Sequence, residues 1–471
     1  MYHRTIFPAI LAATLLAGCT TLIPKYERPP LPVENAYTAS AAERSEASAP
    51  AREVPLATFF GDPRLRALIQ LALDNNRDLR VAALRVEQYA AQYRIARAPL
   101  LPNIGASGAA TRSRTPYEFS PTRQPSTANQ FTVALGLATY EIDFFGRLRS
   151  LKESALETYL ATDDARRTLR LTLITSVATQ YLTTLMLDEQ LSIAQQTLKL
   201  VTDSRDLIQH RYDAGTASEL DLATAQTQVY TTQAAIADLT RQTAQARNAL
   251  TYLIGAPIPA NLPAPLPLKS QNLIPDLPAG VPSDLLTRRP DITAAEHTLR
   301  AANANIGAAR AALFPSITLT AAGGFGSTQL ADLFKADSLM WNLAPKINIP
   351  IFTGGALRAN LAATQAAQKI AIAQYEKAIQ SAFRDISDAL IARRTYADYI
   401  TAIDSNVTAQ QRRYALSDIR YKQGVDSYLT VITAQQSLMA AQQTQITARY
   451  AQLVNLVTLY QALGGDWQQK N

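Results

Sequence analysis

Cysteine, histidine and charged residues are scarce in this sequence. Their scarcity argues against an internal disulfide, a histidine metal site and a nucleic-acid-binding surface. The 471 residues include one cysteine, Cys19, and three histidines, His3, His210 and His297. One cysteine cannot form an internal disulfide, and no two histidines have metal-ligand spacing. Charged residues make up 18% of the chain, and the net charge of +7 is scattered rather than clustered. The sequence therefore indicates no nucleic-acid-binding surface.

Enzyme motifs are missing as well. The sequence contains no nucleophile elbow, no phosphate-binding loop, no metal cluster and no paired carboxylates in a plausible cleft. We therefore expect a protein that is not an enzyme and that uses neither a metal nor a dissociable cofactor.

Glycine and proline are absent from four long intervals, 147–214, 216–254, 356–423 and 425–463. The glycines that bound these intervals are Gly146, Gly215, Gly255, Gly355, Gly424 and Gly464, and each of the last three follows its counterpart by 209 positions (355 − 146, 424 − 215, 464 − 255). Because these two residue types are the strongest helix breakers, each half predicts a long helix, a tip and a shorter return helix. The 68-residue interval would reach roughly 100 Å as a helix.

Four shorter segments have the period of strands. They are 103–112 and 131–140 in the first half, and 316–326 and 341–350 in the second. Each has about the ten residues that a tilted strand needs to cross a bilayer. The alternative is a small soluble sheet.

Four strands are too few for a closed membrane barrel, because an open edge leaves backbone groups unpaired in lipid. The missing strands must then come from other copies of the chain. Two copies would give eight strands and a filled bore, whereas three would give twelve and an open lumen. The long helices favour three.

The halves also predict a domain layout. Asp62-Pro63 is a helix start, with Asp as N-cap and Pro at the first position, and this helix runs to about Ala98. Its counterpart starts near Ser283, contains Pro290 and ends near Leu313. The first repeat is thus 62–256, a Pro-rich connector is 257–282, the second repeat is 283–465, and 466–471 is a tail.

The first return helix carries a heptad seam. Apolar or small residues recur in steps of three and four at Leu222, Ala225, Val229, Thr232, Ile236, Leu239, Thr243, Ala246, Leu250 and Leu253. Such a seam predicts close packing against a neighbouring helix.

The N-terminus predicts a lipoprotein. Residues 1–18 have the pattern of a secretory signal peptide, too short to span a membrane. The stretch Leu16-Ala17-Gly18-Cys19 resembles the bacterial lipobox, which implies cleavage before Cys19 and a diacylglycerol and N-acyl lipid (palmitate) on it. The alternative is an unmodified cysteine. Thr20 favours sorting to the outer membrane, and residues 19–61 form a Pro-rich tether that is largely extended.

Three motifs together resemble a known family. They are Pro-Lys-Tyr-Glu-Arg-Pro at 24–29, Arg-Tyr-Lys-Gln-Gly-Val-Asp-Ser-Tyr-Leu at 420–429, and Leu-Tyr-Gln-Ala-Leu-Gly-Gly-Asp-Trp at 459–467. With the lipobox, they make the chain similar to the outer-membrane efflux lipoproteins of the OprM/NodT branch of the TolC superfamily.

The resemblance implies an α+β, mostly α fold. It implies a homotrimer with a twelve-stranded transmembrane β-barrel, four strands per chain, and a long periplasmic α-helical barrel. An equatorial belt would contain 257–282. The partners would be a periplasmic adaptor protein and an inner-membrane transporter of the RND type, and the trimer would passively conduct small molecules to the exterior.

The resemblance also assigns the helix tips. Gly215, Thr216 and Ala217 in the first half, with Gly424 and Val425 in the second, would dock the adaptor. The alternative is that the two glycines only make turns.

Residues just inside the tips would close the entrance. The resemblance gives Arg420, Tyr421 and Lys422 as a hydrogen-bonding and ionic latch, and Leu429 as an apolar constriction. Where the family often has an aspartate, this chain has Thr433, which removes the basis for an acidic ring. Possible latch acceptors are Asp221 and Asp426, and the alternative is that these charges are only solvated helix ends.

Two other functions remain open. The same fold could serve as a conduit for type I protein secretion. A structural lipoprotein that spans the envelope with long helices is the other possibility, although a spacer would not need the predicted strands.

Overall fold

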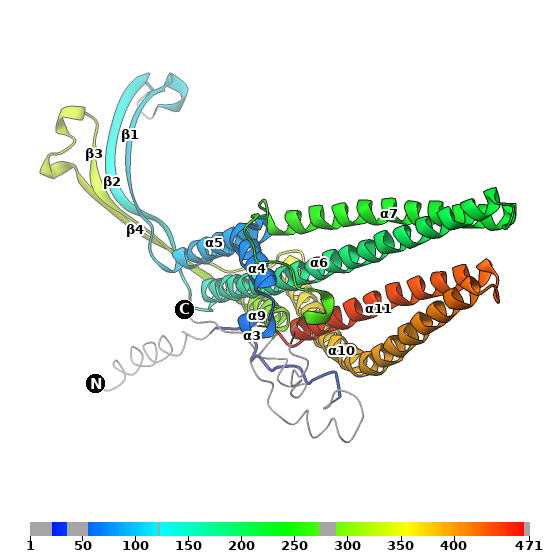
Figure 1. The fold of residues 1–471 in the computed structure, drawn as a ribbon. Coiled ribbons are helices and arrows are strands. Elements are labelled where there is room, and N and C mark those ends of the chain that lie inside the picture. Colours follow the sequence, from blue (N-terminus) through cyan, green and yellow to red (C-terminus); the bar gives the residue numbers. More distant parts are fainter. Residues whose placement is uncertain (1–20, 35–54, 121–122, 272, 274–288, 466–471) are drawn as a thin grey trace. The chain divides into compact units, whose positions relative to one another are not determined.

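The structure of the chain is a computed structural model that describes residues 21–34, 55–120, 123–271, 273 and 289–465 (Figure 1). The signal peptide with Cys19, the tail 466–471 and much of the 257–282 connector lie outside these ranges. The chain forms two compact units. Unit 1 comprises Met1–Pro30, Arg85–Asp163 and Ala294–Glu376, and unit 2 comprises Leu31–Leu84, Asp164–Thr293 and Lys377–Asn471. Each unit takes segments from both halves, so the compact units and the sequence repeats divide the chain differently.

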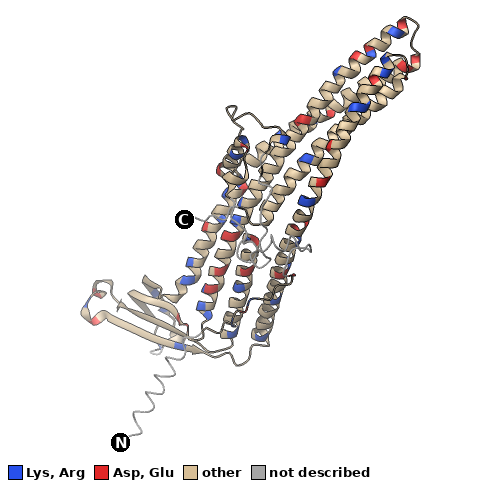
Figure 2. Ribbon diagram, turned by 60° about the horizontal axis from the view of Figure 1, so that its bottom comes forward, with Lys and Arg blue, Asp and Glu red and all other residues tan. Residues whose placement is uncertain are grey.

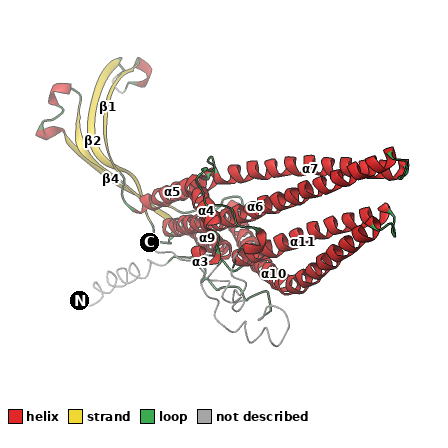
Figure 3. Cartoon of the chain, in the orientation of Figure 1, coloured by secondary structure: helices red, strands yellow, loops and turns green. Residues whose placement is uncertain are grey.

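Unit 1 contains one antiparallel sheet (Figure 3). Its strands are β1 (Ile104–Thr115), β2 (Ser126–Ile142), β3 (Ser316–Ser327) and β4 (Leu339–Asn348), paired in chain order. β2 is longer at both ends than the predicted 131–140, and β4 runs over 339–348 rather than 341–350. Within the described residues, β1 and β4 each pair on one side only, so both edges of the sheet are open.

Each half of the sequence forms one hairpin of two long helices (Figure 1). The first consists of α6 (Arg147–Asp213) and α7 (Glu219–Ile254), and the second of α10 (Ala356–Lys422) and α11 (Tyr428–Ala462). The return helices begin three residues later than the predicted 216 and 425, because the tips need those residues for their turns. Ser218 and Ser427 then stand at the N-caps.

The helix predicted over 62–98 is two helices, α4 (Pro63–Asn75) and α5 (Arg77–Arg97). Asn76 has an extended backbone between them, with ψ 130°. Its side-chain Oδ1 accepts a hydrogen bond from Leu79 N at 2.9 Å, and its Nδ2 donates to Leu253 O at 2.8 Å. The prediction of one helix is wrong because Asn76 ends α4, caps α5 and bonds to α7. The apolar periodicity of the sequence continues through Asn76, so it does not reveal this break.

The counterpart helix, α9 (Pro290–Ala311), begins at Pro290 rather than near Ser283. Proline suits the first helical position because the amide it lacks would have no partner there. The predicted start at 283 falls on residues outside the described ranges.

The core of unit 2 surrounds the start of α4. Phe59, Phe60 and Tyr460 form an aromatic cluster, with the Phe59 and Tyr460 rings stacked at 4.3 Å. Asp62, 1% exposed, caps α4 as predicted by accepting from Arg64 N at 2.7 Å. On α7 the seam residues Leu222, Ala225, Val229, Thr232, Thr243, Ala246 and Leu250 are buried. Among the described helices, none has the uninterrupted apolar length needed to cross a lipid bilayer.

Candidate functional site

The two hairpin tips of unit 2 have the same type of backbone turn. At the first tip, Gly215 N donates to Tyr212 O and Thr216 N to Arg211 O, both at 2.8 Å. At the second, Gly424 N donates to Tyr421 O and Val425 N to Arg420 O, both at 2.9 Å. This pair of bonds is the Schellman motif, whose left-handed residue is usually glycine, and Gly215 and Gly424 have φ of 73° and 75°.

The tips are joined to each other by side chains near their ends. Arg211 Nη1 donates to the Tyr421 hydroxyl at 2.9 Å, and its guanidinium lies 5.1 Å from the centre of the Tyr421 ring. Seven residues before Arg211 on α6, the hydroxyl of Ser204 lies 2.9 Å from that of Tyr428 at the start of α11. Tyr428 also packs in a small apolar cluster with Ile208, Leu222, Ala225, Val431 and Ile432. The two hairpins are thus connected by hydrogen bonds, a cation–π contact and an apolar cluster.

The other predicted latch residues pair within their own hairpin. Arg420 Nε and Nη2 donate to Asp426 at 2.7 and 2.9 Å, and this hydrogen bond lowers the pKa of the Asp426 carboxyl. Lys422 Nζ donates to Asp418 at 2.7 Å, which raises the pKa of the lysine. Figure 2 shows charges of both signs gathered at the ends of the hairpins.

Asp221 takes a different role from that of a latch acceptor. It forms a capping box with Ser218, accepting from Ser218 N at 3.2 Å while Asp221 N donates to Ser218 Oγ at 3.1 Å. Its carboxylate stabilises the start of α7, as expected for a capping box.

A difference between the two halves of the sequence explains why Arg211 and Arg420 have different partners. The two arginines are equivalent positions, 209 residues apart, but the position equivalent to Asp426 is Ala217. Arg211 therefore has no carboxylate at that place in its own tip, and it binds Tyr421 of the other hairpin instead. Two identical backbones thus carry one ion pair within a tip and one hydrogen bond between tips.

The remaining predicted residues are exposed at the tips. Val425 and Leu429 are 59% and 62% exposed, and Leu220, the repeat counterpart of Leu429, is 75% exposed. The Thr433 hydroxyl donates to Leu429 O at 2.8 Å, so it is bonded to its own helix. Thr216 is exposed, and Ala217 packs beside the apolar cluster.

Sequence reasoning did not identify Arg211, Ser204 or Tyr428 as part of this site. Arg211 is the repeat counterpart of Arg420, and that equivalence was a signal for it. Tyr428 lies inside the motif 420–429, so the motif itself was a signal for it. Ser204 had none, because a single serine in a long helix has no distinguishing pattern.

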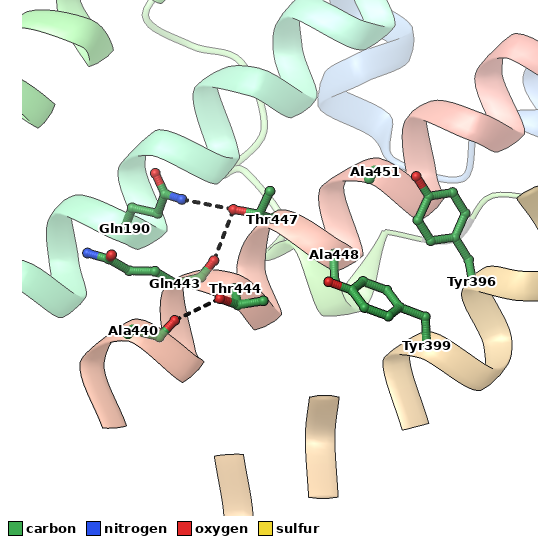
Figure 4. A pocket seen from close by; sticks show the side chains of 9 residues that line it. All are labelled: Gln190, Tyr396, Tyr399, Ala440, Gln443, Thr444, Thr447, Ala448 and Ala451. Carbon is green, nitrogen blue, oxygen red and sulfur yellow. Dashed lines mark hydrogen bonds between the residues drawn. The ribbon is translucent and has the colours of Figure 1, made fainter. Parts of the chain in front are cut away.

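A cavity of about 530 Å³ lies along the second hairpin of unit 2 (Figure 4). Tyr396 and Tyr399 of α10 face a polar stretch of α11, and Gln190 of α6 donates to the Thr447 hydroxyl at 3.2 Å. Within the described ranges, no three or more His, Cys, Asp or Glu side chains are grouped to hold a metal ion.

Comparison with known proteins now decides the family. The profile described as Outer membrane efflux protein matches residues 68–256 and 281–465, one segment in each half. The chain belongs to the outer membrane efflux protein family. The match confirms the resemblance to OprM-type members of the TolC superfamily that the motifs predict.

Similarity to individual members of this family extends along the whole chain. The chain is 44% identical over 469 residues to the toluene efflux pump outer membrane protein TtgC of Pseudomonas putida, covering 99% of this chain and 96% of that protein. It is 39% identical over 458 residues to the cation efflux system protein CusC of Escherichia coli O6:H1, covering 97% and 98%. The solved open state of the MtrE outer membrane channel of Neisseria gonorrhoeae superimposes with a TM-score of 0.86 at 38% identity, covering 96% of this chain and 99% of that chain.

As a member of the outer membrane efflux protein family, the chain has the mostly helical TolC-like fold and is the outer-membrane channel of an efflux pump. The related proteins are channels rather than enzymes.

Proposed function

We propose that the chain acts as a homotrimer whose hairpin tips both close the periplasmic entrance and receive an adaptor protein. The cross-hairpin bond between Arg211 and Tyr421, 2.9 Å long, carries this proposal. It joins the last turns of α6 and α10, beyond the Ser204–Tyr428 hydrogen bond and the apolar cluster around Tyr428, so breaking it loosens the ends of the tips first. Adaptor docking opens the entrance by replacing this contact.

The sheet supports the trimer. β1 and β4 offer open edges among the described residues, and lipid cannot satisfy the backbone groups of an open edge. Pairing β4 of one copy with β1 of the next closes the sheet, and three copies give twelve strands around an open lumen.

Exposed apolar side chains support docking at the tips. Leu220 and Val425 are each more than half exposed, next to turns whose glycines have open space around them. Large apolar side chains at such exposure suit a surface that a partner helix covers. We assign the partners as a periplasmic adaptor and an inner-membrane transporter of the RND type.

The cargo that we propose is small molecules, conducted passively, with energy supplied by the transporter. The P. putida and E. coli relatives are named for toluene and for cations, respectively. We favour organic molecules, because the sequence has only four methionines and three histidines to bind soft metal ions. We further propose a diacylglycerol and an N-acyl chain on Cys19, which lies outside the described residues.

One experiment separates small-molecule efflux from type I secretion. A deletion strain is tested for the minimal inhibitory concentrations of drugs and solvents and for the proteins in its culture medium. Our proposal expects drug sensitivity with normal secretion, restored by the wild-type chain. Loss of a secreted protein with unchanged sensitivity would establish the secretion conduit instead. A trimer that gives no conductance in a planar bilayer, as wild type and as Tyr421→Phe alike, would favour a structural spacer.

A further inference from the structure

The segment Thr21–Arg28, here called the N-terminal strap, follows one face of α9 within unit 1. It contacts α9 residues spaced by four, three, four and three positions, which places them in one stripe. The stripe consists of Glu296, Arg300, Asn303, Gly307 and Arg310. The strap runs antiparallel to the helix, so that its earliest residues meet the end of α9.

Two stripe residues bind the backbone of the strap. Asn303, 3% exposed, donates from Nδ2 to Pro24 O at 2.8 Å and accepts on Oδ1 from Gln368 Nε2 at 2.8 Å. Arg310 Nη1 donates to Leu22 O at 3.4 Å. Because Gln368 fixes which side of the Asn303 amide faces the strap, this buried amide is oriented to receive a chain there.

Glycines make room for the strap. A Cβ on Gly307 would lie 2.6 Å from Ile23 Cγ1 and 2.9 Å from Ile23 N. A Cβ on Gly146, between β2 and α6, would lie 2.7 Å from Thr21 Cα. The strap therefore packs against backbone at both places, closer than any side chain would permit.

Glu296 holds the other end of the strap. This residue is 5% exposed, and its carboxylate accepts from Arg28 Nη2 at 2.8 Å and from the Tyr26 hydroxyl at 3.1 Å. Arg300 Nη2 donates to it at 2.7 Å, and the Arg300 guanidinium lies 5.0 Å from the centre of the Tyr26 ring. Although burial opposes ionisation, the hydrogen bond from Arg28 and the charge of Arg300 keep the pKa of Glu296 below its ordinary value.

The equivalent helix of the first half does not carry this stripe. With the local repeat offset of 213 (310 − 97), the five positions of α5 are Ala83, Glu87, Ala90, Arg94 and Arg97. The carboxylate that binds the strap and the glycine that makes room for it are both absent from α5. Ala83 occupies the position equivalent to Glu296, and Arg94 the position equivalent to Gly307. The stripe is thus particular to α9, not a by-product of duplication.

We propose that the N-terminal strap is a docked element of the folded protein, locked onto α9 by Glu296, and that it ties the N-terminus to the strand-to-helix junction at Gly146. The role in anchoring rests on the lipidation proposed above, whereas the docking does not. Cys19 lies two positions before Thr21, so a lipid on Cys19 would be attached within about 7 Å of chain from the strap. The lipid then holds the body of the protein itself, not the far end of a free tether.

Trypsin tests the lock, because the strap contains Lys25, an exposed residue followed by Tyr26. The full-length trimer in detergent is digested, and cleavage after Lys25 is followed by mass spectrometry. Wild type should resist, whereas Glu296→Gln and Arg28→Ala should be cut at least about tenfold faster, since cleavage follows the population of the undocked strap. Glu27→Gln, an exposed neighbour on the same strap, is the matched control and should resist like wild type.

Equal cleavage rates in wild type, Glu296→Gln and Arg28→Ala would overturn the proposal. If Glu296→Gln does not assemble, Arg28→Ala decides alone, because its side chain lies on the strap and is partly exposed. The mass of the N-terminal peptide reports lipidation independently. A protected strap without lipid would support docking and overturn the anchoring role, and neither result changes whether the trimer conducts.

Discussion

Arg211 and Tyr421 join the two hairpins of the chain at their tips, with Arg211 Nη1 2.9 Å from the Tyr421 hydroxyl and the guanidinium over the ring. The bond connects the last turn of α6 with the last turn of α10. Arg211 and Tyr421 are not equivalent positions of the two halves, since the counterpart of Tyr421 is Tyr212. The link is therefore made once per chain, and it is the contact on which closure of the entrance depends in our proposal.

Tyr421→Phe should open the entrance. It removes the hydroxyl that accepts from Arg211, a hydrogen bond from a charged donor that contributes about 1.5–3 kcal/mol. We expect higher single-channel conductance of the isolated trimer in a planar bilayer. Tyr212→Phe, the repeat counterpart, is the control and should leave conductance unchanged.

The same measurement orders the latch residues. Arg420→Ala should raise conductance less than Tyr421→Phe, because Arg420 pairs with Asp426 of its own tip. Arg211→Ala should give only a small further increase in the Tyr421→Phe background, because the hydrogen bond is already lost and only the contact of the guanidinium with the ring remains. Additive effects, or a larger effect of Arg420→Ala, would contradict this assignment.

Thr433→Asp should make the entrance prefer cations. It adds a carboxylate at an exposed position of α11, and in a trimer the three added charges attract cations and repel anions. The reversal potential in a KCl gradient should shift toward that of K⁺. Thr433→Asn, similar in size but uncharged, should leave it unchanged, and an equal shift in both variants would exclude a charge effect.

Asp62→Ala should destabilise unit 2 by about 2–4 kcal/mol, through loss of an N-cap and of buried hydrogen bonds. Asp62 Oδ2 accepts from the Tyr181 hydroxyl and from Gln271 Nε2, both at 2.9 Å, so the substitution leaves two donors without this acceptor. Thermal unfolding followed by circular dichroism measures the loss. Asp78→Ala, at an exposed position in the first turn of α5, should have little effect, and equal midpoints for both variants would contradict this role of Asp62.

Gly255→Ala should destabilise the protein more than Gly215→Ala, although both glycines have nearly the same φ, 75° and 73°. Each substitution costs about 1–2 kcal/mol of backbone strain. At Gly255 the new Cβ would also lie 2.7 Å from Asn75 O, whereas at Gly215 nothing lies within 4 Å. The difference between the unfolding midpoints of the two variants reports the free-energy cost of the clash with Asn75. Equal midpoints would show that the end of α4 moves away without a loss of stability.

Tyr375 should make stability depend on pH in the alkaline range. Burial, aided by the negative charge of Glu296, raises the pKa of Tyr375 from 10.0 to about 12. The folded state holds this proton more tightly, so the contribution is complete below pH 10 and is lost as the pH rises toward 12. Tyr375→Phe should flatten the fall in unfolding midpoint between pH 10 and 12.

At pH 7 the same variant should change the free energy of unfolding by less than about 1 kcal/mol. Among the described residues, no group forms a hydrogen bond with the buried Tyr375 hydroxyl, so little is lost with it. An unchanged alkaline slope in Tyr375→Phe would show that other groups cause the pH dependence.

The sequence by itself determined the hairpins, their tips and the family. Glycine and proline act on the backbone where they stand, so their spacing placed the ends of α6, α7, α10 and α11 to within a few residues. The cap at Asp62 is equally local. The motifs 24–29, 420–429 and 459–467, together with the lipobox, indicated the family without any knowledge of the contacts of their residues.

Only the tertiary structure decided the partners of individual side chains. Arg211 meets Tyr421 across 210 positions of sequence, and Tyr26 meets Glu296 across 270. Asn76 breaks a helix that local periodicity would continue, because its amide reaches Leu253 on a distant helix. Such contacts depend on how helices pack in space, and no spacing within one helix records which distant residue will face it.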